Sequence, residues 1–109
     1  MFKCTVCGYI HDGEAAPAAC PKCGAPAEKF QAMADDAAML VEKSRHTNGL
    51  HMQLINIFEE VIAIADEGIQ DDLDPNCVKV FTRAQNDAIE LVQSMKAELA
   101  GHMSKGKWG

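Results

Sequence analysis

The chain has 109 residues, a formal net charge of −6 and five cysteines, and 48% of its residues are apolar. A chain of this length holds one ordinary domain, or a compact module joined to a very small one, and its apolar content excludes a disordered acidic tail. The acidic balance argues against binding nucleic acid through its phosphates.

The sequence also carries no signal for a membrane or for secretion. No apolar run approaches the roughly 18 residues of a membrane span, and no apolar signal-peptide core follows Met1. We therefore expect a cytoplasmic protein with no membrane partner. In the cytosol, clustered cysteines indicate metal ligands or redox groups rather than a disulfide framework.

Composition and charge both change near residue 33. Four of the five cysteines lie before this point, whereas Ala, Leu, Ile, Met, Glu and Gln dominate after it. Residues 1–33 are formally neutral, and residues 34–109, with seven basic and thirteen acidic side chains, carry the full −6. We predict a metal-binding domain over residues 1–33, a helical hairpin over 34–103 and a flexible tail over 104–109. The first domain has few large apolar side chains, so a bound metal is expected to hold it together.

The cysteines of the first domain form two Cys-x-x-Cys-Gly motifs, with twelve residues between Cys7 and Cys20. The first contains Cys4 and Cys7, and the second contains Cys20 and Cys23. Each motif can place two thiolates on one metal through a tight turn, and the glycine that follows permits a backbone with positive φ. Two such knuckles facing each other give a tetrahedral site that suits iron or zinc and is poor for hard cations.

This stretch resembles a rubredoxin-like domain, most closely the short form of the rubrerythrins, placed at the N-terminus as in reverse rubrerythrins. Tyr9 and Phe30 match the aromatic positions that this family has near its metal. The resemblance implies one Fe(SCys)4 centre per chain that cycles between Fe(III) and Fe(II). Its ligands would be Cys4, Cys7, Cys20 and Cys23.

The ligands alone do not separate iron from zinc, because a structural zinc ribbon uses the same four thiolates. The two aromatic residues and the sequence Tyr9-Ile10-His11 favour iron. The resemblance implies one-electron transfer rather than bond-making chemistry. Four thiolates leave no open coordination position, so the metal is not expected to bind a substrate.

The second segment has the periodicity of long amphipathic helices. Asp35 and Asp36 are candidate N-caps of the first helix, which we expect to continue through a weak point at Asn48-Gly49. Two apolar stripes follow at alternating spacings of three and four. They consist of Leu50, Leu54, Ile57, Val61 and Ile64, and of Ile55, Phe58, Ile62, Ala65 and Ile69.

The second helix follows a polar turn predicted over residues 68–74. Asp74 and Pro75 have the pattern of an N-cap and a first helical residue, and the helix is expected to end near Gly101. Its apolar stripe consists of Phe81, Gln85, Ala88, Val92, Met95 and Leu99. Because two helices cannot cover such broad apolar faces by themselves, we expect a homodimer in which two hairpins form a four-helix bundle.

A reverse rubrerythrin would also carry a di-iron site in its helical bundle, so we looked for the Glu-x-x-His motif of such sites. No glutamate in the chain has histidine three residues later. Glu98 and His102 are four residues apart, which favours a surface ion pair. His46 and His51 flank Asn48-Gly49, and they are candidates for a second site, although a solvated bend or a hydrogen-bonded core histidine is the simpler interpretation.

Cys77 stands apart from the other cysteines. It falls in the first turn of the second helix, where the helix dipole would lower the pKa of its thiol. A packing role as a small apolar side chain is the simpler interpretation.

The fold class predicted is thus a small metal-bound β module of the rubredoxin or zinc-ribbon type, followed by an all-α hairpin. We predict one-electron transfer through an iron tetrathiolate centre, with a redox protein as partner and no catalytic residue. The alternatives are a structural zinc-bound interaction module and a rubrerythrin-like peroxide reductase with an atypical di-iron site.

Overall fold

A computed structural model describes all 109 residues of the chain. Its contacts divide the chain into two units, one of residues 1–45 with 106–109 and one of residues 46–105. The long helix α1 (Asp35–Asp71) contributes residues to both units.

The first unit contains a three-stranded antiparallel sheet. Its strands are β1 (Phe2–Cys4), β2 (Ile10–His11) and β3 (Phe30–Ala32), in the order β2-β1-β3. A short 3-10 helix, η1 (Ala27–Lys29), leads into β3. Around the cysteines the buried core consists of Cys4, Cys20 and Phe30, with Phe2 and Tyr9 packed partly against it, and Val41 and Ser44 of α1 are also buried in this unit. So small a core cannot offset the entropy of ordering the chain, which agrees with the expected dependence on a metal.

The start of α1 belongs to the same unit and is fastened to it by Arg45. The guanidinium donates two hydrogen bonds of 2.9 Å to the carboxylate of Asp12, and its Nε donates a third to the carbonyl of Gly109. These hydrogen bonds from Arg45 hold the pKa of Asp12 below its usual range. The prediction that Asp35 and Asp36 are N-caps is wrong. They lie inside the first turn of the helix, where acidic side chains also suit the helix dipole.

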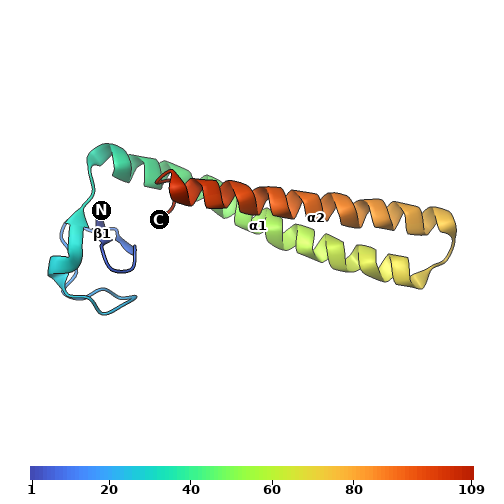
Figure 1. The fold of residues 1–109 in the computed structure, drawn as a ribbon, viewed down its shortest axis with the longest axis horizontal. Coiled ribbons are helices and arrows are strands. Elements are labelled where there is room, and N and C mark those ends of the chain that lie inside the picture. Colours follow the sequence, from blue (N-terminus) through green and yellow to red (C-terminus); the bar gives the residue numbers. More distant parts are fainter. The chain divides into compact units, whose positions relative to one another are not determined.

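The second unit is a hairpin of α1 and α2 (Pro75–Ser104), which lie side by side and are joined by a short turn (Figure 1). The expected continuity of α1 through Asn48-Gly49 is confirmed, because the helix runs unbroken from Asp35 to Asp71. The predicted fold class of a small β module followed by a helical hairpin is therefore confirmed.

The two helices meet along a seam whose residues alternate in spacings of three and four, as in a coiled coil. On α2 the buried residues are Ala88, Val92, Met95, Leu99 and His102. On α1 the seam includes the buried residues Asn48 and Ala65, with Ile55, Phe58 and Ile62 half-buried. Of the two stripes predicted on α1, the one that contains Ile55 and Phe58 is therefore the one that lies in the seam.

The turn between the helices is shorter than predicted. α1 continues past Gly68 to Asp71. The ring of Phe81 lies directly against the backbone of Gly68, where any larger side chain would collide with it. The N-cap of α2 is confirmed, since the Asp74 side chain accepts a 2.8 Å hydrogen bond from the backbone N–H of Cys77.

α2 also ends later than predicted, at Ser104 rather than near Gly101. Gly101 lies within the last turn, where its carbonyl accepts the N–H of Lys105. The glycine with positive φ after the helix is Gly106, at φ 69°. Neither of the two long helices has a stretch apolar enough to cross a membrane.

Candidate metal centre

The four N-terminal cysteines lie on two loops with matching backbone geometry. In the first loop, the N–H of Gly8 donates to the carbonyl of Cys4 at 2.9 Å, and in the second the N–H of Gly24 donates to the carbonyl of Cys20 at 2.9 Å. Gly8 and Gly24 have φ angles of 77° and 75°, so each loop needs the left-handed conformation that glycine adopts most readily. The glycine that follows each Cys-x-x-Cys pair is therefore explained by the turn.

Each loop is closed by a further hydrogen bond two residues beyond its second cysteine. The N–H of Cys4 donates to the carbonyl of Tyr9, and the N–H of Cys20 donates to the carbonyl of Ala25, both at 2.8 Å. Lys22 of the second loop also donates to the carbonyl of Cys7 in the first, at 3.4 Å. The backbone thus holds the two cysteine pairs opposite each other.

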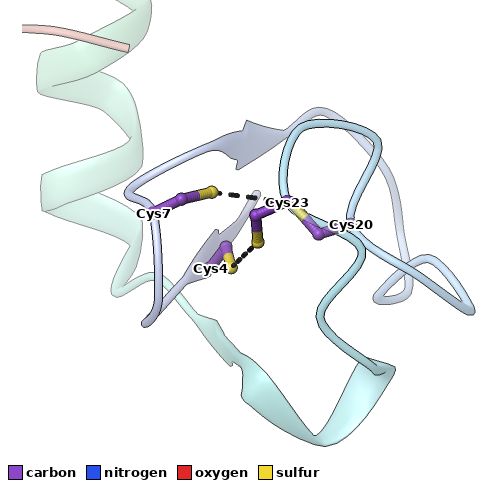
Figure 2. A group of neighbouring side chains, drawn as sticks. All are labelled: Cys4, Cys7, Cys20 and Cys23. Atoms are coloured by element: carbon purple, nitrogen blue, oxygen red, sulfur yellow. Dashed lines mark hydrogen bonds between the residues drawn. The ribbon is translucent and has the colours of Figure 1, made fainter.

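The four sulfurs converge on one point (Figure 2). All lie within 4.8 Å of one another, with 3.8 Å between the sulfurs of Cys4 and Cys23 and 3.6 Å between those of Cys7 and Cys20. In a tetrahedral site with metal–sulfur bonds of about 2.3 Å, neighbouring sulfurs lie roughly 3.8 Å apart. The residues present therefore fit a tetrathiolate metal ion, and the four predicted ligands come together in one site.

The backbone of the loops prepares these thiols for ionisation. Burial disfavours the thiolate of Cys20, but the backbone N–H groups of Cys23 and Lys22 outweigh it and lower the pKa of Cys20 to about 7. Cys4 behaves alike, since the amides of Cys7 and Val6 overcome burial and lower its pKa. Without a metal, four thiolates this close repel one another and cannot all ionise.

Cys23 shows that repulsion most clearly. The N–H of Ala25 favours its thiolate, but burial and the neighbouring sulfurs of Cys7, Cys20 and Cys4 raise the pKa of Cys23 to about 12. A cation among the sulfurs would remove this penalty. The site is therefore arranged for a positively charged ligand.

The site is buried on one side and open on the other. Cys4 and Cys20 are almost fully buried beside Phe30, with Tyr9 packed against them, whereas Cys7 is half-buried and Cys23 is exposed. The predicted positions of Tyr9 and Phe30 near the cysteines are thus confirmed. Two of the four cysteines, Cys7 and Cys23, therefore reach the surface.

The histidines singled out in the sequence do not form a second site with each other. His46 is exposed, while His51 is half-buried and its ring lies edge-on to that of His102, with 6.2 Å between ring centroids. The buried histidine of the hairpin is instead His102, which the predicted apolar stripe of α2 did not include. Its Nδ1 donates to Oδ1 of Asn48 at 2.6 Å, in the interior of the hairpin.

The prediction of a surface ion pair between Glu98 and His102 is half wrong. Nε2 of His102 lies 3.2 Å from Oε1 of Glu98, so the two side chains meet as predicted, but the histidine is buried rather than at the surface. The signal was present in the sequence, because His102 continues the seam spacing of Met95 and Leu99, and Asn48 precedes Ile55 by one heptad.

Cys77 lies outside the metal site, and its pKa does not follow the prediction from the helix dipole. Its Sγ donates to the carboxylate of Asp74 at 3.4 Å. This hydrogen bond, together with burial, raises the pKa of Cys77, because the nearby carboxylate disfavours a second negative charge. The N-cap of the helix therefore suppresses the reactive thiolate that the helix N-terminus would favour.

The N-terminal residues are similar to those of known proteins. Residues 2–31 match the family model described as the rubredoxin-like domain of rubrerythrin. Over 35 residues the chain is 57% identical to reverse rubrerythrin-1 of Clostridium acetobutylicum. The aligned stretch is 32% of this chain and 19% of that relative. The chain thus matches less than a fifth of the relative's length, and no solved structure matches it. The N-terminal part of this chain is accordingly a metal-binding rubredoxin-like module related to that of reverse rubrerythrin.

Proposed function

We propose that the chain is a one-electron transfer protein whose rubredoxin-like module holds a single iron ion. The observation that carries the proposal is the closed set of four converging sulfurs, from Cys4, Cys7, Cys20 and Cys23. Four thiolate ligands complete a tetrahedral site and leave no position for a substrate. Bound iron would supply an Fe(III)/Fe(II) couple, whereas bound zinc would supply no redox chemistry.

The surroundings of the sulfurs support electron exchange at the surface. Cys23 is exposed, Cys7 is half-buried, and the side chain of Val6 beside them is 62% exposed. A partner protein can approach this edge without entering the module. The buried side, with Cys4, Cys20 and Phe30, keeps water from half of the site.

Backbone amides supply the electrostatic control that such a centre needs. The same N–H groups that lower the pKa values of Cys4 and Cys20 point at their sulfurs and spread negative charge when a metal is bound. A tetrathiolate centre gains one negative charge on reduction, so these dipoles favour the reduced form. These amides all belong to the two cysteine loops, so the helices contribute none of them.

A redox partner would dock on the helical region in this proposal. The full net charge of −6 lies on residues 34–109, so a partner with a basic surface would be attracted to it. Such attraction would weaken with added salt, which distinguishes it from an apolar contact.

The proposal is tested by titrating the iron-loaded chain with a chemical reductant while its thiolate-to-iron absorption is recorded. We expect reversible loss of the visible bands at one electron per iron. The Cys20→Ser variant should lose the bands, while Cys77→Ser, which alters the cysteine outside the site, should keep them. A chain that retains only zinc after production with ample iron, and shows no redox change, would instead support the structural zinc module.

A further inference from the structure

One apolar stripe on α1 has no partner in the hairpin. Its residues follow the alternating spacing of three and four, and most are between 44% and 63% exposed: Leu50, Leu54, Ile57 and Ile64, with Val61 half-buried between them. Contiguous exposure of this many large apolar side chains is uncommon on a monomer and marks an interaction surface.

Polar pairs between the helices show which side of the seam this stripe occupies. Lys96 lies 3.9 Å from Glu59, and Gln85 donates to Asp66 at 3.4 Å. At about 100° per residue, Glu59 and Asp66 lie to one side of the seam on α1, and the exposed stripe lies to the other. The hairpin therefore has one side bridged by polar side chains and one side without them.

α2 extends the apolar side. Val80, Ala84 and Leu91 lie across the seam from Gln85 and Lys96 by the same helical geometry, and Val80 and Leu91 are exposed. We use the name apolar face for the combined set, which contains Leu50, Leu54, Ile57, Val61, Ile64, Val80, Ala84 and Leu91. All eight members of the set are apolar, while two acidic residues, Asp87 and Glu98, lie on the same face of α2, seven residues after Val80 and Leu91.

The exposed area of the chain is large enough to supply a stable interface. A compact monomer of this mass exposes roughly 5,900 Å², whereas this chain exposes 7387 Å². The difference is roughly 1,500 Å² for the whole chain, which is more than the roughly 800 Å² that one protein buries in a standard interface.

We propose that a second copy of this chain covers the apolar face, so that two hairpins form a four-helix bundle. A two-fold interface brings the same patch from both chains together, so the apolar side chains of one α1 stripe can cover those of the other. A transient redox partner would need a smaller and more polar surface than this one. The inference deepens the proposed function, whose docking region would be this dimer.

Sedimentation analysis of the metal-loaded chain tests the proposal. We expect the native chain to sediment at twice the 11.8 kDa of one chain. The Ile57→Lys and Ile64→Lys double variant should sediment at half the native mass, because it places four lysines in the dimer interface. The matched control is the double variant Asn56→Lys and Ala63→Lys, which adds the same charges one position earlier on the helix, outside the apolar face, and should remain dimeric.

A second measurement covers the case in which the variant fails to fold. If the native chain is a dimer, its melting temperature rises with protein concentration, since dilution favours dissociation. A native chain that sediments as a monomer at 100 μM, or melts at one temperature over a hundredfold range of concentration, would overturn the proposal. So would a double variant that remains a dimer. Neither result alters the absorption of the metal centre, so the failure of this inference and of the proposed function are distinguishable.

Discussion

The two units of this protein reach a stable fold by different means. The β module of the N-terminal unit, residues 1–33, buries Cys4, Cys20 and Phe30, and two of these three side chains are metal ligands in the proposed site. The hairpin buries a continuous seam of apolar residues along α1 and α2 and needs no ligand for its secondary structure. In the first unit, folding therefore depends on the same metal that carries the proposed chemistry. In the second unit, the hairpin can form on its own, and the proposed dimer is a separate step.

The largest expected effect is removal of the metal. Structural tetrahedral zinc sites contribute about 10–16 kcal/mol of binding free energy to folding, and the small core here offers little else. We expect a chelator to unfold the N-terminal unit and leave the helices intact. Amide hydrogen exchange checks this, through loss of protection at Cys4 and Cys20, whose N–H groups bond Tyr9 and Ala25, beside retained protection in α2.

The claim that only the first unit depends on a metal would be contradicted if the chain kept its protection at Cys4 and Cys20 after the chelator had removed the metal. It would also be contradicted if helix content measured by circular dichroism fell together with the N-terminal unit. Lowering the pH tests the same point without a chelator, because protons compete with the metal for the thiolates. Metal release should therefore increase as the pH falls.

A cavity in the hairpin is expected to be the next largest effect. Leu99 is buried in the seam, and large-to-small substitutions at such positions cost about 2–5 kcal/mol. The Leu99→Ala variant should lower the melting temperature of the helices and leave the absorption of the metal centre unchanged. The matched control is Gln93→Ala, which changes an exposed residue of the same helix to alanine without opening a cavity. Loss of the metal in Leu99→Ala would show that the units fold as one.

The buried polar pair in the seam gives a smaller effect. Asn48→Ala removes the acceptor for Nδ1 of His102, and an unsatisfied buried polar group costs about 1–3 kcal/mol. Chemical denaturation followed by circular dichroism measures the loss. The neighbouring Thr47→Ala, on the exposed side of the helix, controls for helix propensity. Equal stabilities for the two variants would mean that the pair contributes nothing to the hairpin.

The smallest effect concerns the surface ion pair of the first unit. Arg45 lowers the folded-state pKa of Asp12 below its unfolded value. This contribution to stability is therefore fully present above the unfolded pKa and is lost as the pH falls through the folded pKa. Both side chains are substantially exposed, so the contribution is at most about 1 kcal/mol. Asp12→Asn should flatten the acid side of the stability profile of the first unit, and an unchanged profile would contradict this role.

The metal centre was the part of the molecule most fully predictable from sequence. Two Cys-x-x-Cys-Gly motifs specify their own turns, because Gly8 and Gly24 occupy positive φ and the flanking amides then face the sulfurs. All four predicted ligands therefore came together. The backbone rules that decide such a site act within a few residues, which is the range over which sequence patterns are reliable.

The hairpin was predictable in kind but not in detail. The same spacing fits both stripes on α1, so periodicity alone does not tell which of Ile55 and Ile57 faces α2. The turn was misplaced because glycine usually ends a helix, whereas Gly68 lies inside α1 against the ring of Phe81. His102 continues the seam spacing, but its hydrogen bond cannot be predicted from local pattern because the partner, Asn48, lies 54 positions away in the sequence. Each of these details depends on contacts between segments rather than on local pattern.

The central claim is that the four cysteines hold one redox-active iron per chain. Elemental analysis combined with an absorption spectrum, on chain produced with ample iron, tests it most directly. The account predicts one iron per chain and a coloured protein whose thiolate-to-iron bands disappear on reduction and return on oxidation. A colourless protein with one zinc per chain would contradict it.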